Sequence, residues 1–159
     1  MNRVIFFLLV SSLLFTAAAC STKKPPEQSA IQGNKVISTL QDMSRTYEKK
    51  DLSAFMAQVA NAYEDRKALV KSLESIFAKY ETVRFTIQYT KMLITVEYKA
   101  MTKAAFNWDS EWQTAGGSVQ KNSGRSTFVF DPRETKLVYI DGKNPFIPQP
   151  TETPGKQMK

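Results

Sequence analysis

The sequence predicts an α+β fold in which three N-terminal helices pack on an antiparallel sheet. Apolar residues recur every three or four positions in the first half of the chain, which is typical of amphipathic helices. From residue 83 onward they alternate with polar residues, which is typical of half-buried strands. Helices followed by a run of strands favour one layer of helices covering one face of a sheet.

Three apolar faces define the expected helices. They comprise Val36, Leu40, Met43 and Tyr47; Leu52, Phe55, Val59 and Tyr63; and Leu69, Leu73, Ile76, Phe77 and Tyr80. Asp51 and Asp65 precede the second and third faces. An aspartate at that position can cap a helix by accepting a hydrogen bond from a free backbone N–H.

The expected strands cover residues 83–89, 93–98, 119–131 and 136–140. Residues 101–113 are ambiguous, because Trp108 and Trp112 fit both strand alternation and helical i, i+4 spacing. Gly116-Gly117 predicts a hairpin turn, and the stretch from Asp131 to Glu134 predicts a second turn with proline at its second position.

Four segments stand out when the chain is compared with known folds: YEKKDLSAFMA (47–57), ESIFAKYETVRFTIQY (74–89), FNWDSEW (106–112) and LVYIDGKNPF (137–146). In this order they resemble the nuclear transport factor 2-like superfamily, in which a curved sheet wraps round helices as a cone. The resemblance assigns residues 101–113 to a strand. It implies a cone that often holds a small molecule, a superfamily that includes isomerases, cyclases and hydrolases, and dimers that form through the open sheet face.

The first 20 residues have the order of a secretory signal. Arg3 gives a positive start, residues 4–15 are mostly apolar, and small residues precede Cys20. Ala17-Ala18-Ala19-Cys20 resembles the lipobox of bacterial lipoproteins, although leucine is more usual at the first position. The resemblance implies cleavage after residue 19 and attachment of a diacylglyceryl group and fatty acyl chains such as palmitate to Cys20. The alternative is ordinary cleavage that leaves a free cysteine.

The expected organisation follows from this start. Residues 1–19 form the signal peptide, 20–34 the lipidated cysteine and a flexible tether, 35–147 the cone domain and 148–159 a disordered tail. Ser21 follows the cysteine where aspartate retains lipoproteins in the inner membrane of the best-known bacteria. The resemblance therefore implies a lipoprotein of the cell envelope, at the outer membrane and facing the periplasm.

Composition excludes several classes of site. The chain has no histidine and one cysteine, so a histidine-dependent triad, an intrachain disulfide and a multi-cysteine zinc site are ruled out. No phosphate loop or calcium loop is present, and we expect no metal and no cofactor. The net charge is +7, but the lysines are scattered, so we expect no nucleic-acid partner.

Two groups of residues are candidates for a site. One is a set of aromatic residues that either line a pocket in the cone or simply fill the core. It comprises Tyr47, Tyr63, Phe106, Trp108, Trp112 and Phe128. The other is the carboxylate pair Asp109 and Glu111, which either acts in acid–base catalysis or faces away from the tryptophans toward solvent or a partner.

The sequence therefore supports a membrane-anchored envelope lipoprotein whose cone domain binds a partner protein or a small apolar ligand without catalysis. A homodimer through the sheet face is a further expectation, with Trp108, Trp112 and alternating charges as contacts. The alternative is an anchored isomerase or hydrolase of a small hydrophobic substrate. It would use a carboxylate in the cone, with Asp109 and Tyr63 as the pair to consider.

Overall fold

The computed structural model describes residues 26–96 and 101–149. Within these residues three helices come first and five strands follow, as the sequence predicts. The helices are α1 (Pro26–Glu48), α2 (Leu52–Ala57) and α3 (Arg66–Lys79). The strands are β1 (Thr82–Ile87), β2 (Leu93–Val96), β3 (Thr102–Gln113), β4 (Val119–Phe130) and β5 (Leu137–Gly142), with a 3-10 helix, η2 (Tyr89–Lys91), between β1 and β2.

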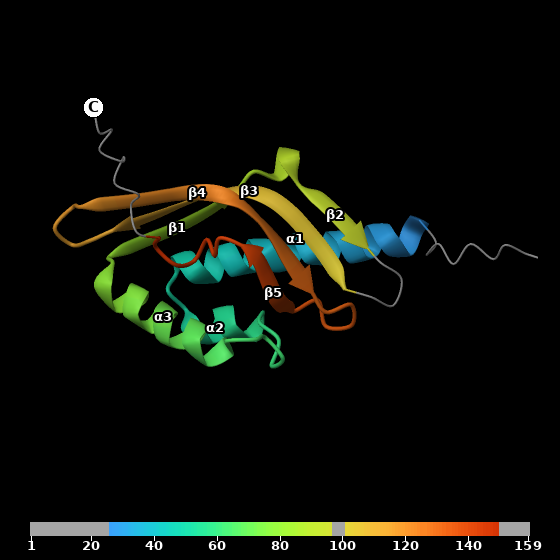
Figure 1. Ribbon diagram of the computed structural model, residues 1–159, viewed down its shortest axis with the longest axis horizontal. Coiled ribbons are helices and arrows are strands. Elements are labelled where there is room, and N and C mark those ends of the chain that lie inside the picture. Colours follow the sequence, from blue (N-terminus) through green and yellow to red (C-terminus); the bar gives the residue numbers. More distant parts are fainter. Residues whose placement is uncertain (1–25, 97–100, 150–159) are drawn as a thin grey trace, which may run out of the picture.

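The strands form one antiparallel sheet in the order β1-β3-β4-β5, and β2 also pairs with β3. β1 pairs with residues 108–113 of β3, whereas β2 pairs with residues 102–105. The long β3–β4 hairpin arches over α1, and α2 and α3 lie on the same side of the sheet (Figure 1). We call the face toward the helices the inner face and the opposite one the outer face. The predicted α+β cone is confirmed.

Helix α1 packs its predicted apolar face against the sheet. Val36, Leu40, Met43 and Tyr47 are all completely buried, so the prediction from their spacing is confirmed. The interior around them is continuous, because residues of all three helices and of the sheet belong to one apolar core. A core of this kind fixes the position of the inner face of β3 relative to α1.

The start of α1 differs from the expectation. The helix begins at Pro26, so residues 26–34, expected as part of a flexible tether, are helical. Proline suits the first turn because its missing N–H has no partner there in any case. Gln32 is buried, and its Nε2 donates to Oγ1 of Thr135 at 3.4 Å. The domain therefore begins nine residues earlier than residue 35.

The two predicted aspartate caps have different outcomes. Oδ1 of Asp51 accepts a hydrogen bond from the Ala54 N–H at 2.9 Å, which confirms the cap of α2. Asp65 occupies the N-cap position of α3, but its side chain makes no capping hydrogen bond, so that prediction is wrong. α2 is also shorter than predicted. It ends before Val59, because the chain there pairs with Leu137 at the edge of β5.

The predicted turns and strands are confirmed within the described residues, with one exception. The strand predicted over residues 83–89 ends at Ile87, because the chain turns there through the 3-10 helix that begins at Tyr89. Gly117 has φ +79 in the β3–β4 turn, and its N–H donates to the Thr114 carbonyl. Oδ1 of Asp131 accepts from the N–H groups of Arg133 and Glu134, which closes the β4–β5 turn. The last two residues of the predicted strand 93–98 lie outside the described residues, as do the predicted signal peptide (1–19), Cys20 and residues 150–159.

A segment after β5, residues 143–149, crosses the inner face of the sheet, and we call it the strap. Its last two residues were expected to belong to a disordered tail. Instead, the Gln149 N–H donates to Oδ1 of Asn122 at 3.1 Å. Its carbonyl accepts from Nε2 of Gln120 at 2.7 Å. The ordered domain thus reaches at least residue 149.

Gly124 provides a test of how tightly the sheet packs. It lies opposite Trp108 in the β3–β4 register, and a Cβ there would come within 2.9 Å of Cζ2 of the tryptophan ring. We expect Gly124→Ala to lower the free energy of unfolding by about 1–3 kcal/mol in urea denaturation. Gly33→Ala is the control, because its Cβ would meet nothing within 4 Å. Because residue 33 lies in α1, Gly33→Ala should raise the free energy of unfolding by about 0.5–1 kcal/mol. Equal stabilities of the two variants would contradict the packing described.

Candidate functional site

Strand alternation on β3 sorts the candidate residues onto opposite faces of the sheet. Trp108 and Trp112 point inward and are buried, whereas Asp109 and Glu111 lie between them in sequence and point outward. The predicted placement of the carboxylates opposite the tryptophans is therefore confirmed. The expectation that the tryptophans contact a second copy is wrong, because a residue of inward parity on a strand cannot reach the outer face.

The predicted pocket residues form packed core. Tyr47, Phe106, Trp112 and Phe128 are 0% exposed and Trp108 is 1% exposed. A side chain that borders a water-sized void keeps some accessible surface, so these five are surrounded by protein atoms. The structure therefore favours core over pocket, the two alternatives that the sequence left open. The sixth residue, Tyr63, is half-buried in the segment between α2 and α3, and burial raises its pKa.

Phe146 of the strap fills the centre of the cone. Its ring centroid lies 4.8 Å from those of Phe55 and Phe85, and 5.2 Å from that of Tyr47. It is also 5.9 Å from Phe128, so rings from two helices and two strands surround it. This arrangement places an aromatic side chain of the chain itself where a cone would otherwise have room for a ligand.

Buried polar side chains tie the strap to the sheet and to α1. Nε1 of Trp112 donates to the Tyr47 hydroxyl at 2.6 Å, and that hydroxyl donates to the Phe146 carbonyl at 2.9 Å. Burial raises the pKa of Tyr47, although the hydrogen bond from Trp112 acts in the opposite direction. On the same face, the Ser110 hydroxyl donates to the Pro145 carbonyl at 2.7 Å. These hydrogen bonds fix the position of the Phe146 ring within the core.

A second chain of hydrogen bonds holds the beginning of the strap. Nε1 of Trp108 donates to Oγ of Ser126 at 2.8 Å, and Ser126 donates to the Lys143 carbonyl. Among the described residues, the buried polar side chains are amides, hydroxyls and indoles, and none is a carboxylate, lysine or arginine. The interior therefore offers tyrosine and serine hydroxyls, but no charged group for proton transfer.

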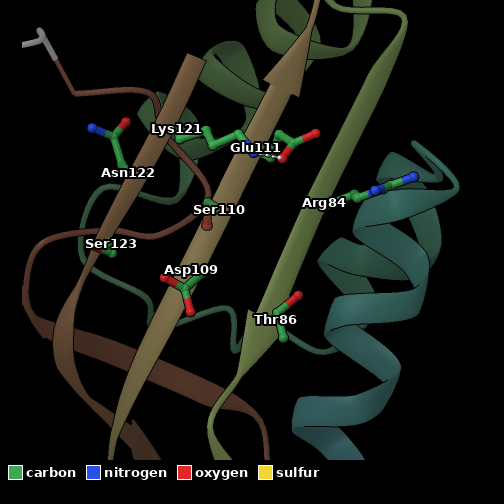
Figure 2. Close-up of a pocket in the computed structure, with 8 residues that line it drawn as sticks. All are labelled: Arg84, Thr86, Asp109, Ser110, Glu111, Lys121, Asn122 and Ser123. Carbon is green, nitrogen blue, oxygen red and sulfur yellow. Dashed lines mark ion pairs between the residues drawn. The ribbon is translucent and has the colours of Figure 1, made fainter. Parts of the chain in front are cut away.

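The charged groups gather instead in a hollow of about 430 Å³ on the outer face. Figure 2 shows its side chains on three neighbouring strands, β1, β3 and β4. Those that point outward are Arg84, Thr86, Asp109, Glu111, Lys121 and Ser123. Ser110 and Asn122 complete the lining and also bond the strap, so the hollow is backed by the segment that closes the core.

The strand register places charges of both signs side by side in this hollow. Arg84 lies opposite Glu111, and Glu111 lies opposite Lys121. Nζ of Lys121 is 2.8 Å from Oε2 of Glu111, and this bond lowers the pKa of that carboxyl. Asp109 accepts a hydrogen bond from Nε2 of Gln88 at 3.2 Å. The charge of Arg84 also lowers the pKa of Glu111, but its guanidinium makes no hydrogen bond or ion pair with another described residue, so its N–H donors are available to a partner.

This geometry does not support the predicted acid–base role. Glu111 is held ionised by Lys121 on the surface of the sheet, where it has no proton to donate near neutral pH. Asp109 is exposed on β3, while Tyr63 lies in the segment that borders β5, so the expected pair is not brought together in one cavity. Within the described residues, no cluster of acidic or cysteine side chains could hold a metal ion.

Three residues of functional interest were not singled out from the sequence. Arg84 and Lys121 look like ordinary surface charges until the pairing of β1, β3 and β4 places them beside Glu111. Phe146 and its neighbour Ile147 lie between two prolines, outside any repeating apolar pattern, so periodicity gives no sign that Phe146 is buried. Two signals were available: its position directly after Pro145, and its place at the end of the segment LVYIDGKNPF (137–146) that resembles the superfamily.

Comparison with solved structures identifies the architecture. The described domain resembles a nuclear transport factor 2-like superfamily protein from Salmonella enterica serovar Typhimurium. The two are 12% identical over 80% of this chain and 99% of the other, with a TM-score of 0.61. A scytalone dehydratase-like protein from Novosphingobium aromaticivorans has 10% identity over 72% and 84% of the two chains, and a TM-score of 0.65. PrhC from Penicillium brasilianum has 15% identity over 69% and 79%, and a TM-score of 0.59.

The two other comparisons give no information on activity. No protein-family model matches the chain, and no curated protein matches it. None of the helices in the described ranges combines the length and apolar character needed to cross a bilayer. Sequence identities this low establish shared architecture and leave function to the site itself. The helices and curved sheet described here, together with these similar structures, show that the chain has the nuclear transport factor 2-like cone fold.

Proposed function

We propose that this chain is a lipid-anchored protein of a bacterial envelope whose cone domain binds a protein partner through the outer face of its sheet, without catalysis. The observation that carries the binding mode is the contrast between the two faces. Phe146 fills the inside of the cone. The outer face instead has a hollow that contains Arg84, which makes no hydrogen bond with a described residue, and the ion pair between Lys121 and Glu111. We therefore expect the domain to bind its partner through the outer face of the sheet and not through its interior.

Anchoring is proposed from the sequence around Cys20. A short apolar run and three alanines precede the chain's one cysteine, in the order that lipoprotein processing requires. One acyl chain gives only marginal membrane binding, whereas two or three give stable attachment. Ser21 in place of aspartate supports the outer membrane, with the domain facing the periplasm.

A second copy of the chain is the partner that the outer face fits best. The face carries positive Arg84 and Lys121 close to negative Asp109 and Glu111. In a two-fold dimer the same patch contacts itself, so it must contain both members of each complementary pair. Electrostatic complementarity of this kind selects the partner and fixes the register of the contact.

An enzyme acting inside the cone is the second candidate, and the scytalone dehydratase-like neighbour is the reason to keep it. An isomerase or hydrolase of a small hydrophobic substrate would need a carboxylate facing the interior. Asp109 and Glu111 both face outward, and Phe146 occupies the space that the substrate would require. The geometry therefore supports partner binding more strongly than catalysis.

Site-specific photo-crosslinking in cells tests the proposed partner. A photoreactive residue at Thr86, in the hollow, is expected to yield a covalent dimer of the chain, whereas one at Lys67 on α3 is not. Arg84→Glu places a negative charge beside Glu111 and should reduce the crosslinked fraction about tenfold, which corresponds to about 1.4 kcal/mol. Lys71→Glu, which makes the same change of charge at an exposed position of α3, is the matched control. Equal crosslinking at Thr86 and Lys67 would rule out the outer face as the interface.

A further inference from the structure

We infer that the end of the domain where α1 begins rests on the lipid surface that holds the anchor, with Ile31 and Met101 in contact with the bilayer. This orientation depends on the proposed attachment at Cys20. It goes further, because a lipidated domain on a long tether would have no fixed side toward the membrane. We call this end, with Ile31 and Met101 as its exposed apolar residues, the basal end.

Three parts of the fold meet at the basal end. The end of β2 pairs with the beginning of β3, with Val96 opposite Thr102, and Thr102 lies opposite Phe130 at the end of β4. The hydrogen bond from Gln32 to Thr135 joins the first turns of α1 to the β4–β5 turn. Figure 1 shows the start of α1, the end of β2 and the end of β4 at the same end of the molecule.

The length of chain before α1 limits the distance from the membrane. Only residues 21–25 separate Cys20 from the first residue of the helix, Pro26. Even a fully extended chain spans at most about 3.3–3.6 Å per residue, so the start of α1 lies within about 20 Å of the acylated cysteine. The polar headgroup zone occupies about 5–8 Å of that distance on each side of a bilayer. The basal end is therefore within reach of the lipid surface.

The exposed side chains of the basal end suit a bilayer. Ile31 is 50% exposed and Met101 is 38% exposed, although both are large and apolar. Apolar side chains gain free energy by entering the boundary between headgroups and acyl chains. On α1, Lys35 and Glu27 lie one turn to either side of Ile31, and their charges offset each other. Ile31 therefore lies between two opposite charges on α1, and it is Ile31 and Met101 that expose apolar surface at this end.

The other end of the domain provides an internal comparison. Val119 is also exposed, at 45%, but it lies beside the β3–β4 turn, opposite Gln113. The twelve residues of β3 separate the two ends by about 36–40 Å. Two apolar side chains of similar exposure thus lie at opposite ends of one rigid sheet, and only Ile31 is held near the anchor.

The experiment uses the full lipidated protein purified from membranes. Formation of the thioether with the diacylglyceryl group consumes the thiol of Cys20, the chain's one cysteine, so a cysteine introduced at Ile31 or Val119 is the one free thiol in each variant. Each variant is labelled with a bimane fluorophore and reconstituted in vesicles of phosphatidylethanolamine and phosphatidylglycerol that carry brominated acyl chains. We expect the label in Ile31→Cys to be quenched at least about twofold more than the label in Val119→Cys. Met101→Cys should behave as Ile31→Cys does.

Two results would overturn the orientation, and intact mass distinguishes them. If Cys20 carries lipid and the labels at 31 and 119 are quenched equally, the basal end does not rest on the bilayer while the attachment stands. If the mass shows an unmodified Cys20, the attachment and the orientation both fail. Circular dichroism of the labelled variants confirms that both fold, as expected for substitutions at exposed positions.

Discussion

Phe146→Ala is expected to lower the free energy of unfolding by about 3–5 kcal/mol, because it empties the centre of the cone. The ring contacts side chains from α1, α2, β1 and β4, so no single element can collapse into the space that it leaves. Urea denaturation at neutral pH, followed by tryptophan fluorescence, measures the loss. The strap should also become more accessible to proteases, since it loses a completely buried aromatic ring and keeps its hydrogen bonds and the packing of half-buried Ile147.

Tyr139→Ala is the matched control for this substitution. Tyr139 is also aromatic, but it is 46% exposed on β5, so its removal should change stability by less than about 1 kcal/mol. A Phe146→Ala variant that folds should bind a small apolar molecule such as benzene, because an apolar cavity of this kind stays dry. A loss as small as that of Tyr139→Ala would show that the strap is not part of the core.

Cys20→Ser is expected to abolish incorporation of labelled palmitate into the protein in growing cells. Serine has no thiol to form the thioether, and the chain contains no other cysteine to take its place. The fatty acyl label is a better measure than fractionation, because an uncleaved signal peptide could itself keep the variant on a membrane. Detergent phase separation of the product gives a second readout of attached lipid.

Ser21→Ala is the control for this variant. It changes the next residue by one hydroxyl and leaves the thiol of Cys20 in place, so labelling should stay at the level of the unmodified sequence. Equal palmitate incorporation in Cys20→Ser and the unmodified chain would mean that the acyl chains are attached elsewhere, and the lipobox interpretation would be wrong.

The proposed anchor and the hollow together set the height above the membrane at which a second copy would bind. Asp109 lies seven residues after Thr102 on β3, so the hollow is about 23 Å above the basal end along the strand. A second copy held on the same membrane would present its own outer face at a similar height. Shared anchoring raises the effective concentration of two such faces without any additional contact.

Much of the fold was predictable because it depends on periodicity. The apolar face from Val36 to Tyr47 and the alternation on β3 each follow from one repeat, and the structure confirms both. The boundary of α1 was not predictable in this way, because residues 26–34 include two polar glutamines and a glycine. Tertiary contacts decide it instead, since Gln32 hydrogen-bonds Thr135, more than one hundred residues away.

The site was less predictable than the fold, for a physical reason. Alternation placed Asp109 and Glu111 opposite the tryptophans, but it could not show that Lys121 pairs with Glu111, because that contact depends on the register of two strands. Whether the aromatic residues enclosed a cavity depended on one ring, that of Phe146, contributed by a segment without periodicity. A cavity depends on how side chains from distant parts of the chain pack together, and local sequence patterns do not show this packing.

The intact mass of the protein extracted from membranes tests the attachment most directly. We expect a chain that begins at Cys20, lacks residues 1–19 and carries the added mass of a diacylglyceryl group and an acyl chain. A chain that retains residues 1–19, or one that begins at an unmodified Cys20, would contradict the proposal that this cone domain works at the surface of a membrane.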